Sequence, residues 1–229
     1  MLKINGFQKM TLLDFPGKVA CTVFTGGCNF RCPFCHNSRL VNNTAQLIDE
    51  AEVLAFLEKR RGLLDGVCIT GGEPLLQSDI GSFMLKLKQM GYAVKLDTNG
   101  SFPDRLKKLV SEGIVDYVAM DVKNSPEKYA LTAGNDNVSV ESVKESIEFL
   151  LTDAVDYEFR TTVVKNFHRI EDIREAARSI SGAKRYFLQY FVDSGEVLES
   201  GLEPVSKEIM EKMRDEAAVF VASAEIRGG

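Results

Sequence analysis

Three of the chain's five cysteines, Cys28, Cys32 and Cys35, fall within the short segment GGCNFRCPFCHN. Thiolates are soft ligands that select zinc or iron-sulfur clusters. In the spacing C-x3-C-x2-C, a short loop can wrap a compact inorganic core so that each thiolate reaches a different metal ion. Gly26 and Gly27 relieve backbone crowding before the loop. The spacing therefore predicts a metal centre.

Two alternatives to a cluster stay open from the residues alone. One is a structural zinc site completed by His36, and the second is a set of three unrelated buried thiols. Structural zinc sites usually pair a two-cysteine knuckle with a distant second pair, which this chain lacks. A cubane cluster has four irons, so three cysteines leave one iron without a protein ligand. The spacing therefore favours an iron-sulfur cluster with one open coordination position.

The pattern of apolar residues predicts an alternation of strands and helices. Short β-rich runs predict six strands, at 19–24, 66–70, 92–96, 117–120, 158–164 and 185–188. Apolar residues three and four apart predict six helices, at 48–61, 79–90, 103–111, 139–151, 170–179 and 206–222. Such alternation implies parallel strands, and six units fall short of a closed barrel of roughly 250 residues. We expect an α/β fold, a partial, laterally open (β/α)6 TIM-like barrel, in a single domain of residues 1–229.

Polar motifs follow four successive predicted strands. The cysteine loop follows the first strand, GGEP (71–74) the second, DTNG (97–100) the third and DVK (121–123) the fourth. Chemistry in parallel architectures gathers at the carboxyl ends of the strands. We therefore expect these motifs to lie at one edge of the sheet.

The composition excludes several classes of protein. The sequence contains no run of roughly 18 apolar residues, the length needed to span a membrane. Its first residues lack the apolar core of a signal peptide. We therefore expect a cytoplasmic protein with no membrane partner. A net charge of -5 without a basic block argues against a nucleic-acid partner. An odd number of cysteines argues against a disulfide framework, and we expect Cys21 and Cys68, inside strands, to be core residues.

The segment CNFRCPFC resembles the signature of the radical S-adenosylmethionine (SAM) superfamily. In that family the open iron binds the amino and carboxylate groups of the methionine moiety. Further segments, including GLLDGVCITGGEPLLQ, GYAVKLDTNG and VDYVAMDVKNSPEKY, are similar to the activating proteins of anaerobic ribonucleoside-triphosphate reductase. These are glycyl-radical enzyme activases related to the pyruvate formate-lyase activating enzyme, and the likeness covers about residues 6–191.

The resemblance implies a 4Fe-4S cluster on Cys28, Cys32 and Cys35. The reduced cluster would cleave SAM to methionine and a 5'-deoxyadenosyl radical, which generates a glycyl radical on a partner enzyme. The implied partners are an anaerobic (class III) ribonucleotide reductase and a low-potential electron donor such as flavodoxin or ferredoxin. A radical enzyme acting on another glycyl-radical enzyme, a peptide or a small molecule is an alternative, and a non-catalytic metal-binding or redox-sensing module is a remote one.

By the same resemblance, Phe34 lies against the adenine, with His36 and Asn37 beside that pocket. The alternative for Phe34 is an ordinary core aromatic. His168 follows in a later loop, where we expect it at the surface.

The GGE motif implies that Gly71, Gly72 and Glu73 hold the methionine amine. Glycines allow close approach of the backbone, and a carboxylate accepts hydrogen bonds from an ammonium group. Without the cysteine motif, GGEP would read equally well as a turn.

Resemblance also assigns residues at the third, fourth and fifth strand ends. Asp97, Thr98 and Asp121 would reach SAM and a bound monovalent cation, since such ions prefer hard oxygen ligands. Lys123 would face the methionine carboxylate or ribose, and the Arg160 fork suits a bidentate pair with that carboxylate. The alternatives are an Asp-Lys ion pair at the barrel rim and a solvated strand end for Arg160.

Two features depart from the family pattern. Phe191 stands where the pyruvate formate-lyase activase has a histidine near the ribose, which puts that contact in doubt. Residues 50–62 read as one helix without cysteines, so we expect no auxiliary cluster.

Overall fold

The computed structural model describes residues 2–42, 44–193 and 195–228. The chain divides into two compact units. Unit 1 comprises Met1–Asn29, Arg39–Thr98 and Asp104–Val118. Unit 2 comprises Phe30–Ser38, Asn99–Pro103 and Ala119–Gly229. The single domain expected from the sequence stays a prediction.

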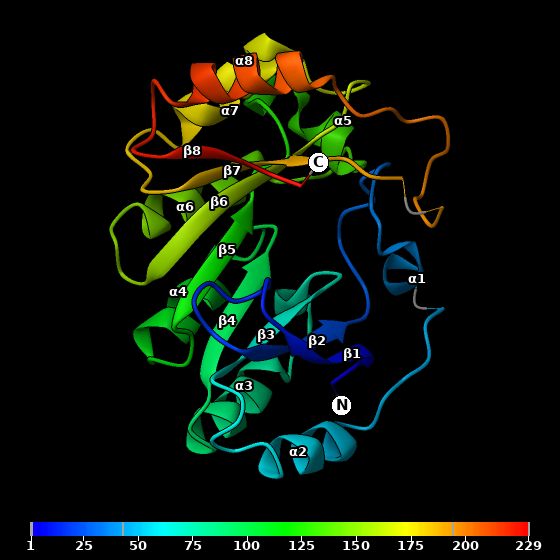
Figure 1. Cartoon of the computed structure of the whole chain (residues 1–229), viewed down its shortest axis with the longest axis vertical. Coiled ribbons are helices and arrows are strands. Elements are labelled where there is room, and N and C mark those ends of the chain that lie inside the picture. The colour runs from blue at the N-terminus through cyan, green and yellow to red at the C-terminus, as the bar shows by residue number, and fades with distance from the viewer. Residues whose placement is uncertain (1, 43, 194, 229) are drawn as a thin grey trace. The chain divides into compact units, whose positions relative to one another are not determined.

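Eight strands form a sheet in which each strand neighbours the next in sequence order (Figure 1). They are β1 (Ile4–Thr11), β2 (Ala20–Thr25), β3 (Gly66–Gly71), β4 (Ala93–Thr98), β5 (Tyr117–Asp121), β6 (Asp156–Val163), β7 (Tyr186–Tyr190) and β8 (Ala224–Arg227). β1 runs antiparallel to β2, whereas β2, β3 and β4 pair in parallel, as do β6, β7 and β8. Because β1 and β8 end the order, the sheet is open. The predicted α/β class with an open, mainly parallel sheet is confirmed.

All six predicted strands are present, and the sequence missed β1 and β8. β1 contains irregularities of register between Ile4 and Gly6 and between Gln8 and Thr11. These shifts break the alternation of apolar and polar residues by which a strand is recognised. β8 has only four residues, too few to show a period.

Helices connect the strands on the predicted pattern. They are α1 (Ser38–Val41), α2 (Glu50–Glu58), α3 (Ile80–Gln89), α4 (Pro103–Ser111), α5 (Tyr129–Ala133), α6 (Val140–Leu150), α7 (Ile170–Ser179) and α8 (Lys207–Ala217), with 3-10 turns η1 (Pro74–Leu76) and η2 (Pro126–Lys128). The predicted bounds of α4 and α7 are confirmed. The helix predicted to reach residue 61 ends at Glu58, where the N–H of Arg60 turns back to the carbonyl of Leu57, and the short α1 and α5 were not predicted. Side-chain caps set the start of three others, because Asp49, Ser139 and Ser206 each accept a hydrogen bond from a backbone N–H of the first turn.

The last predicted helix is shorter than expected. α8 ends at Ala217, where the N–H of Phe220 turns back to the carbonyl of Ala217. The N–H of Ala222 then donates to the carbonyl of Ala183, ahead of β7, which starts the return to the sheet. Apolar residues after Ala217 therefore belong to this turn.

In unit 2, α7 and α8 lie side by side over β7 and β8 (Figure 1). An ion pair between Arg174 and Glu216, 2.8 Å long, joins the two helices. The buried faces of the helices carry Ile173, Met210 and Met213. In unit 1, Phe15, Ala20 and Tyr117 form a compact apolar cluster, with the two rings 6.0 Å apart.

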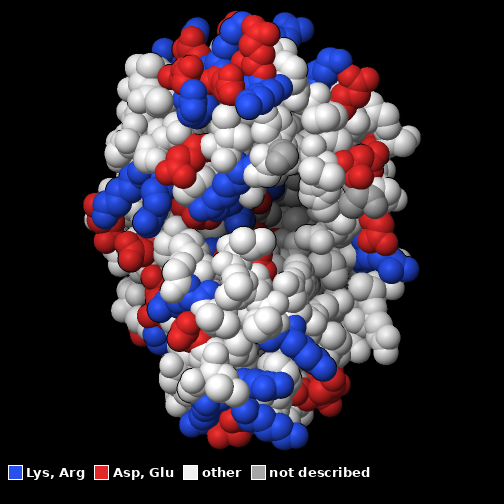
Figure 2. All heavy atoms as spheres, viewed as in Figure 1, with Lys and Arg blue, Asp and Glu red and all other residues white. Residues whose placement is uncertain are grey.

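Charged side chains are mixed on the face shown in Figure 2, where Lys and Arg alternate with Asp and Glu. No helix among the described residues is long and apolar enough to cross a membrane.

Candidate functional site

The start of the cysteine loop is held in unit 1 by the segment that follows β3. The N–H of Glu73 donates to the carbonyl of Gly27 at 2.9 Å, and the N–H of Gly72 donates to the carbonyl of Thr25 at 2.9 Å. A Cβ on Gly72 would lie 2.0 Å from the carbonyl oxygen of Gly27. Gly71 has a φ of 116°, a conformation that favours glycine. The two glycines of GGE therefore permit the close approach of two backbone segments.

Glu73 is fully buried and its side chain has partners within unit 1. Its Oε1 accepts hydrogen bonds from the N–H of Leu75, at 3.0 Å, and from the hydroxyl of Thr98, at 2.9 Å. The first of these caps the turn η1. The structure thus makes Glu73 an anchor of its own loop, and its contact with a methionine amine stays a prediction.

The same loop is clamped from α4. The Arg105 guanidinium donates to the carbonyls of Leu75 and Gln77, and the side chain of Gln77 donates to the carbonyl of Gly26 at 2.5 Å. Sequence reasoning missed Arg105 and Gln77, because neither belongs to a chemical motif. Their hydrogen bonds link α4 to the loop after β3, and that loop to Gly26 just before the cysteine loop.

The other two cysteines of the motif lie in unit 2. The N–H of Cys35 donates to the carbonyl of Cys32 at 2.9 Å, which closes a tight turn. The turn is preceded by a second close approach of backbones, since the N–H of Arg31 donates to the carbonyl of Ala133 at 2.8 Å. A Cβ on Gly134, whose φ is 61°, would lie 2.1 Å from the carbonyl oxygen of Arg31. Glycines therefore fix the cysteine loop in each unit.

The donor chemistry of the three cysteines suits an iron-sulfur cluster. None of the three forms a disulfide within the described part of the chain; Cys32 is buried, and Cys28 and Cys35 are partly exposed. Burial raises the pKa of Cys32 to about 11, against the lowering effect of the Lys123 charge. Cys28 belongs to unit 1, whereas Cys32 and Cys35 belong to unit 2. Among the described residues, no three His, Cys, Asp or Glu side chains are grouped to hold a metal ion, so the fit rests on donor type and accessibility.

The end of β5 carries one carboxylate shared by two cations. Asp121 Oδ2 lies 2.9 Å from Lys123 Nζ, and Asp121 Oδ1 lies 3.0 Å from Arg160 Nε. Burial would raise the pKa of Asp121, but the charges of Lys123 and Arg160 lower it to about 2. Burial would lower the pKa of Lys123, but the negative charges of Asp121 and of an ionised Cys32 raise this pKa above its ordinary value. The ion pair left open by the sequence is therefore present, and two cations share the Asp121 carboxylate.

The prediction that His168 lies at the surface is wrong, since only 3% of it is exposed. Its Nε2 lies 2.8 Å from the carbonyl oxygen of Lys123, and its Nδ1 lies 3.1 Å from the N–H of Val164. Burial lowers the pKa of His168, which favours the neutral ring. The loop after β6 folds back against the end of β5, and the apolar Phe167 was the one sequence signal that this loop is not solvated.

Phe34 is buried in unit 2 and packs against this same loop. Its ring centroid lies 5.9 Å from that of Phe167 and 6.3 Å from that of His168. Phe34 is therefore a buried core aromatic in this structure, which was the alternative given in the sequence analysis. Its contact with an adenine stays a prediction.

His36 and Phe191 form a second aromatic pair. Their rings stack with centroids 5.7 Å apart and planes at 21°. Phe191 is buried, whereas His36 is exposed and Asn37 is half-buried. Phe191, which stands where the related activase has a histidine, thus packs against His36, the residue after the last motif cysteine.

The end of β4 carries a charge pair that the sequence only half revealed. Lys95, with 2% of its side chain exposed, forms an ion pair with Asp97. The buried thiol of Cys68 lies 3.8 Å from Lys95 Nζ and 3.7 Å from Asp97 Oδ1. Cys21 is also buried, and burial raises its pKa to about 12, so both strand cysteines are core residues as predicted. A lysine inside the apolar run AVKLD was a signal for this pair.

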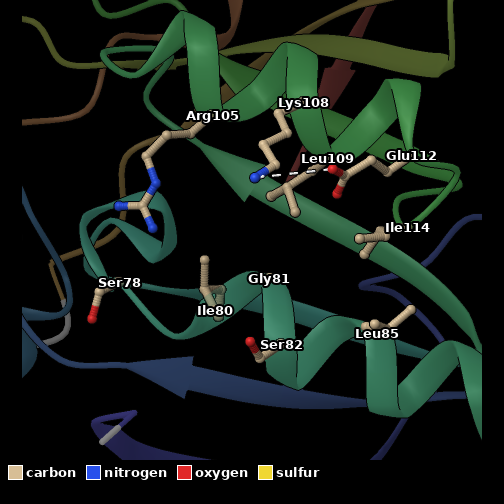
Figure 3. A pocket seen from close by; sticks show the side chains of 10 residues that line it. All are labelled: Ser78, Ile80, Gly81, Ser82, Leu85, Arg105, Lys108, Leu109, Glu112 and Ile114. Atoms are coloured by element: carbon tan, nitrogen blue, oxygen red, sulfur yellow. Dashed lines mark ion pairs between the residues drawn. The ribbon is translucent and has the colours of Figure 1, made fainter.

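A pocket of about 280 Å³ lies between α3 and α4 in unit 1 (Figure 3). Arg105 and Lys108 reach into it from α4, opposite Ile80 and Ser82 of α3. None of the residues predicted from the motifs lines this pocket. The pocket shares Arg105 with the loop that follows β3, to which that side chain donates hydrogen bonds.

The chain matches the model of one protein family and is similar to several individual proteins. The model of the Radical SAM superfamily matches residues 22–180. A Methanocaldococcus jannaschii protein named "Putative glycyl-radical enzyme activating enzyme" is 30% identical over 192 residues, 82% of this chain and 79% of that protein. A "Probable GTP 3',8-cyclase" of Thermococcus kodakarensis is 26% identical over 210 residues, 82% of this chain and 66% of the cyclase.

A solved structure shares the fold. It is a domain of the pyruvate-formate lyase-activating enzyme from Bacteroides vulgatus, with a TM-score of 0.58 and 18% identity over 71% of this chain and 99% of that one. Together with the match of the family model over more than half the sequence, this likeness agrees with the open, mainly parallel α/β sheet. The chain belongs to the radical SAM superfamily.

Proposed function

We propose that the protein is a glycyl-radical enzyme activase whose partner is an anaerobic (class III) ribonucleotide reductase. Membership of the superfamily implies a 4Fe-4S cluster and SAM as cofactors. When bound, these supply the electron and the 5'-deoxyadenosyl radical that removes a hydrogen atom from a glycine. The chain itself binds and orients the cofactors and excludes side reactions.

One observation carries the proposal, namely the two cationic side chains held together at the end of β5. Lys123 and Arg160 share the single carboxylate of Asp121, and Lys123 is near enough to Cys32 to lower the pKa of its thiol. An ammonium and a guanidinium together suit a carboxylate ligand, since charge-assisted bonds are the strong ones. We assign the methionine carboxylate of SAM to Lys123 and Arg160.

The remaining roles follow from the chemistry of each side chain. Cys28, Cys32 and Cys35 ligate the cluster as thiolates. Backbone groups at Gly71 and Gly72, with the Glu73 carboxylate, bind the methionine amine. In unit 2 the adenine lies against Phe34, beside His36 and Asn37. Asp97, Thr98 and Asp121 are assigned to the rim of the SAM site as anchored oxygen groups.

The activase class is supported by the names of relatives, whereas the choice of the reductase as partner is supported by the motif resemblance alone. A relative with 30% identity is named as an activating enzyme of glycyl-radical enzymes. The segments GYAVKLDTNG and VDYVAMDVKNSPEKY resemble the activases of the reductase. The electron donor in this proposal is flavodoxin or ferredoxin, and the compartment is the cytoplasm.

The test is an anaerobic activation assay. The reconstituted protein is mixed with SAM, dithionite and the reductase, and a glycyl doublet is expected by electron paramagnetic resonance. If 5'-deoxyadenosine forms without a doublet, the partner is wrong and the SAM chemistry stands. If neither forms, the activase proposal fails.

A second candidate function is radical chemistry on a small molecule. It is favoured by the cyclase relative, which matches this chain over 82% of its length. The two candidates differ in what makes 5'-deoxyadenosine production rise. Stimulation by the reductase supports the activase, and stimulation by GTP supports the small-molecule enzyme.

A further inference from the structure

Lys95 and Asp97 form an internal charge pair on one face of β4. They are two residues apart, so their side chains lie on the same side of the strand. Lys95 has 2% and Asp97 14% of its side chain exposed, and Lys95 Nζ is paired with Asp97 Oδ1. Lysine is almost never fully buried unless it is paired, because desolvating an ammonium costs several kcal/mol. The fold thus holds this ammonium beside its carboxylate.

The neighbours of Lys95 fix the position of its ammonium group. Cys68 on β3 is the register partner of Lys95 on β4, and Cys68 Sγ lies 3.8 Å from Lys95 Nζ. On the β5 side, the Tyr117 ring centroid lies 6.0 Å from Lys95 Nζ, within the range of a cation-π contact. A thiol, an aromatic ring and a carboxylate therefore surround one positive charge.

The oxygen groups predicted to bind a monovalent cation already have partners in the chain. The Asp97 carboxylate is paired with Lys95, and the Thr98 hydroxyl donates to Glu73. In unit 2, Asp121 is paired with both Lys123 and Arg160. Hard cations bind carboxylate and carbonyl oxygens, whereas here each of the two carboxylates is compensated by a charge of the protein. These described residues therefore fit an added cation poorly.

We propose that the Lys95 ammonium takes the place of a monovalent cation at Asp97, so that SAM binding does not depend on Na⁺ or K⁺. Lys95 is then a positioning residue, which holds the Asp97 carboxylate in one place and neutralises it. The inference rests on the SAM site proposed above and not on the identity of the partner enzyme.

The test measures SAM affinity of the reconstituted full chain by equilibrium dialysis in KCl, NaCl or choline chloride at equal ionic strength. For the unmodified protein, the dissociation constant changes less than about twofold between salts, since coupling between sites starts at about fivefold. Lys95→Met binds SAM weakly in choline chloride and recovers about fivefold or more in KCl or NaCl. Lys95→Arg keeps the charge and the indifference to the salt.

Lys88→Met is the matched control. Lys88 also pairs with an aspartate of unit 1, with its Nζ 2.6 Å from Asp116 Oδ1, but both side chains are more exposed. Loss of this pair leaves the affinity for SAM equal in the three salts. Cation dependence in Lys88→Met would overturn the assignment, because the effect would not be specific to Lys95.

A second measurement needs neither cluster nor SAM. Thermal unfolding of the cluster-free chain is compared in KCl and choline chloride, and only Lys95→Met, or Lys95→Gln if the former does not fold, is expected to be stabilised by KCl. The inference is overturned if the unmodified chain loses more than about fivefold in SAM affinity without Na⁺ or K⁺, or if neither variant responds to them. Absence of SAM binding in every salt contradicts the proposed function, and the unfolding data then decide the inference alone.

Discussion

The two units carry Asp-Lys pairs of opposite order at the ends of neighbouring strands in the sheet order. In unit 1 the lysine precedes the aspartate, as Lys95-Leu96-Asp97, and Lys95 is the more deeply buried member. In unit 2 the aspartate comes first, as Asp121-Val122-Lys123, and Arg160 adds a second cation. The Asp97 carboxylate is paired with one cation, whereas the Asp121 carboxylate is paired with two.

The difference shows how one strand-end position can serve two purposes. A neutral buried pair positions its own carboxylate and offers little attraction to an anion. A carboxylate that pairs with two cations fixes their positions, and an ammonium and a guanidinium side by side suit an anionic ligand. The β5 set is therefore assigned to anion binding, and the β4 pair to positioning.

The largest effect is expected where unit 2 holds the cysteine turn. Gly134→Ala destabilises the cluster-free chain by roughly 2–4 kcal/mol, because the new Cβ meets the Arg31 carbonyl and the positive φ is disfavoured. Gly182→Ala is the control, since Gly182 has a φ of 89° with no atom near its Cβ position, and it costs only about 1–2 kcal/mol. Denaturant unfolding measures both. Equal losses would mean that the close approach of backbones contributes nothing.

The next largest effect is expected from removing one of the two cations at the end of β5. Lys123→Met lowers kcat/KM for SAM cleavage by about 10–100-fold, the loss of one charge-assisted bond. Lys184→Met removes a lysine from a pair with Asp153 in which about half of each side chain is exposed, and it leaves kcat/KM unchanged. Rates are followed as 5'-deoxyadenosine formed per minute. If Lys123→Met cleaves SAM at the normal rate, the contrast between the two strand ends has no functional meaning.

A smaller effect is expected from replacing the planar guanidinium of Arg160 by an ammonium group, which keeps the positive charge. Arg160→Lys raises the KM for SAM by about 3–10-fold with little change in kcat, since a lysine cannot form a fork-shaped pair. Steady-state kinetics over a range of SAM concentrations separates the two constants. An unchanged KM would remove Arg160 from the carboxylate site.

The smallest effect concerns His168, which supports the backbone of Lys123. Because burial lowers the pKa of His168 from 6.5, the folded state resists protonation and the unfolded state does not. The stabilising contribution is present above pH 6.5 and is lost as pH falls below it, with a slope of at most about 1.4 kcal/mol per pH unit. His168→Gln reduces this slope in urea unfolding of the cluster-free chain. An unchanged slope would show that His168 is not buried as a neutral ring.

Much of the fold was predictable from the sequence because its strands are short apolar runs separated by amphipathic helices. α4 and α7 were predicted to the residue, since Pro103 marks the first turn of one and a run of residues with helical period marks the other. β1 and β8 were not, because bulges in one and the brevity of the other erase the period of two.

The chemistry of the candidate site was more predictable than its supports. Cysteines, GGE and DVK are recognisable by residue type and spacing. Lys95, Arg105 and His168 are not, because their roles arise from contacts with residues 2 to 45 positions away in the chain. The error at His168 has this cause, since a polar residue in a loop is exposed by default and only tertiary packing buries it.

The most direct test of the central claim follows one hydrogen atom. A candidate reductase carrying deuterated glycine is incubated anaerobically with the reconstituted protein, SAM and dithionite, and the 5'-deoxyadenosine is analysed by mass spectrometry. The proposed function predicts one deuterium in the 5'-deoxyadenosine together with a glycyl radical signal from the reductase. Unlabelled 5'-deoxyadenosine with no glycyl radical, on every glycyl-radical enzyme tried, would contradict it.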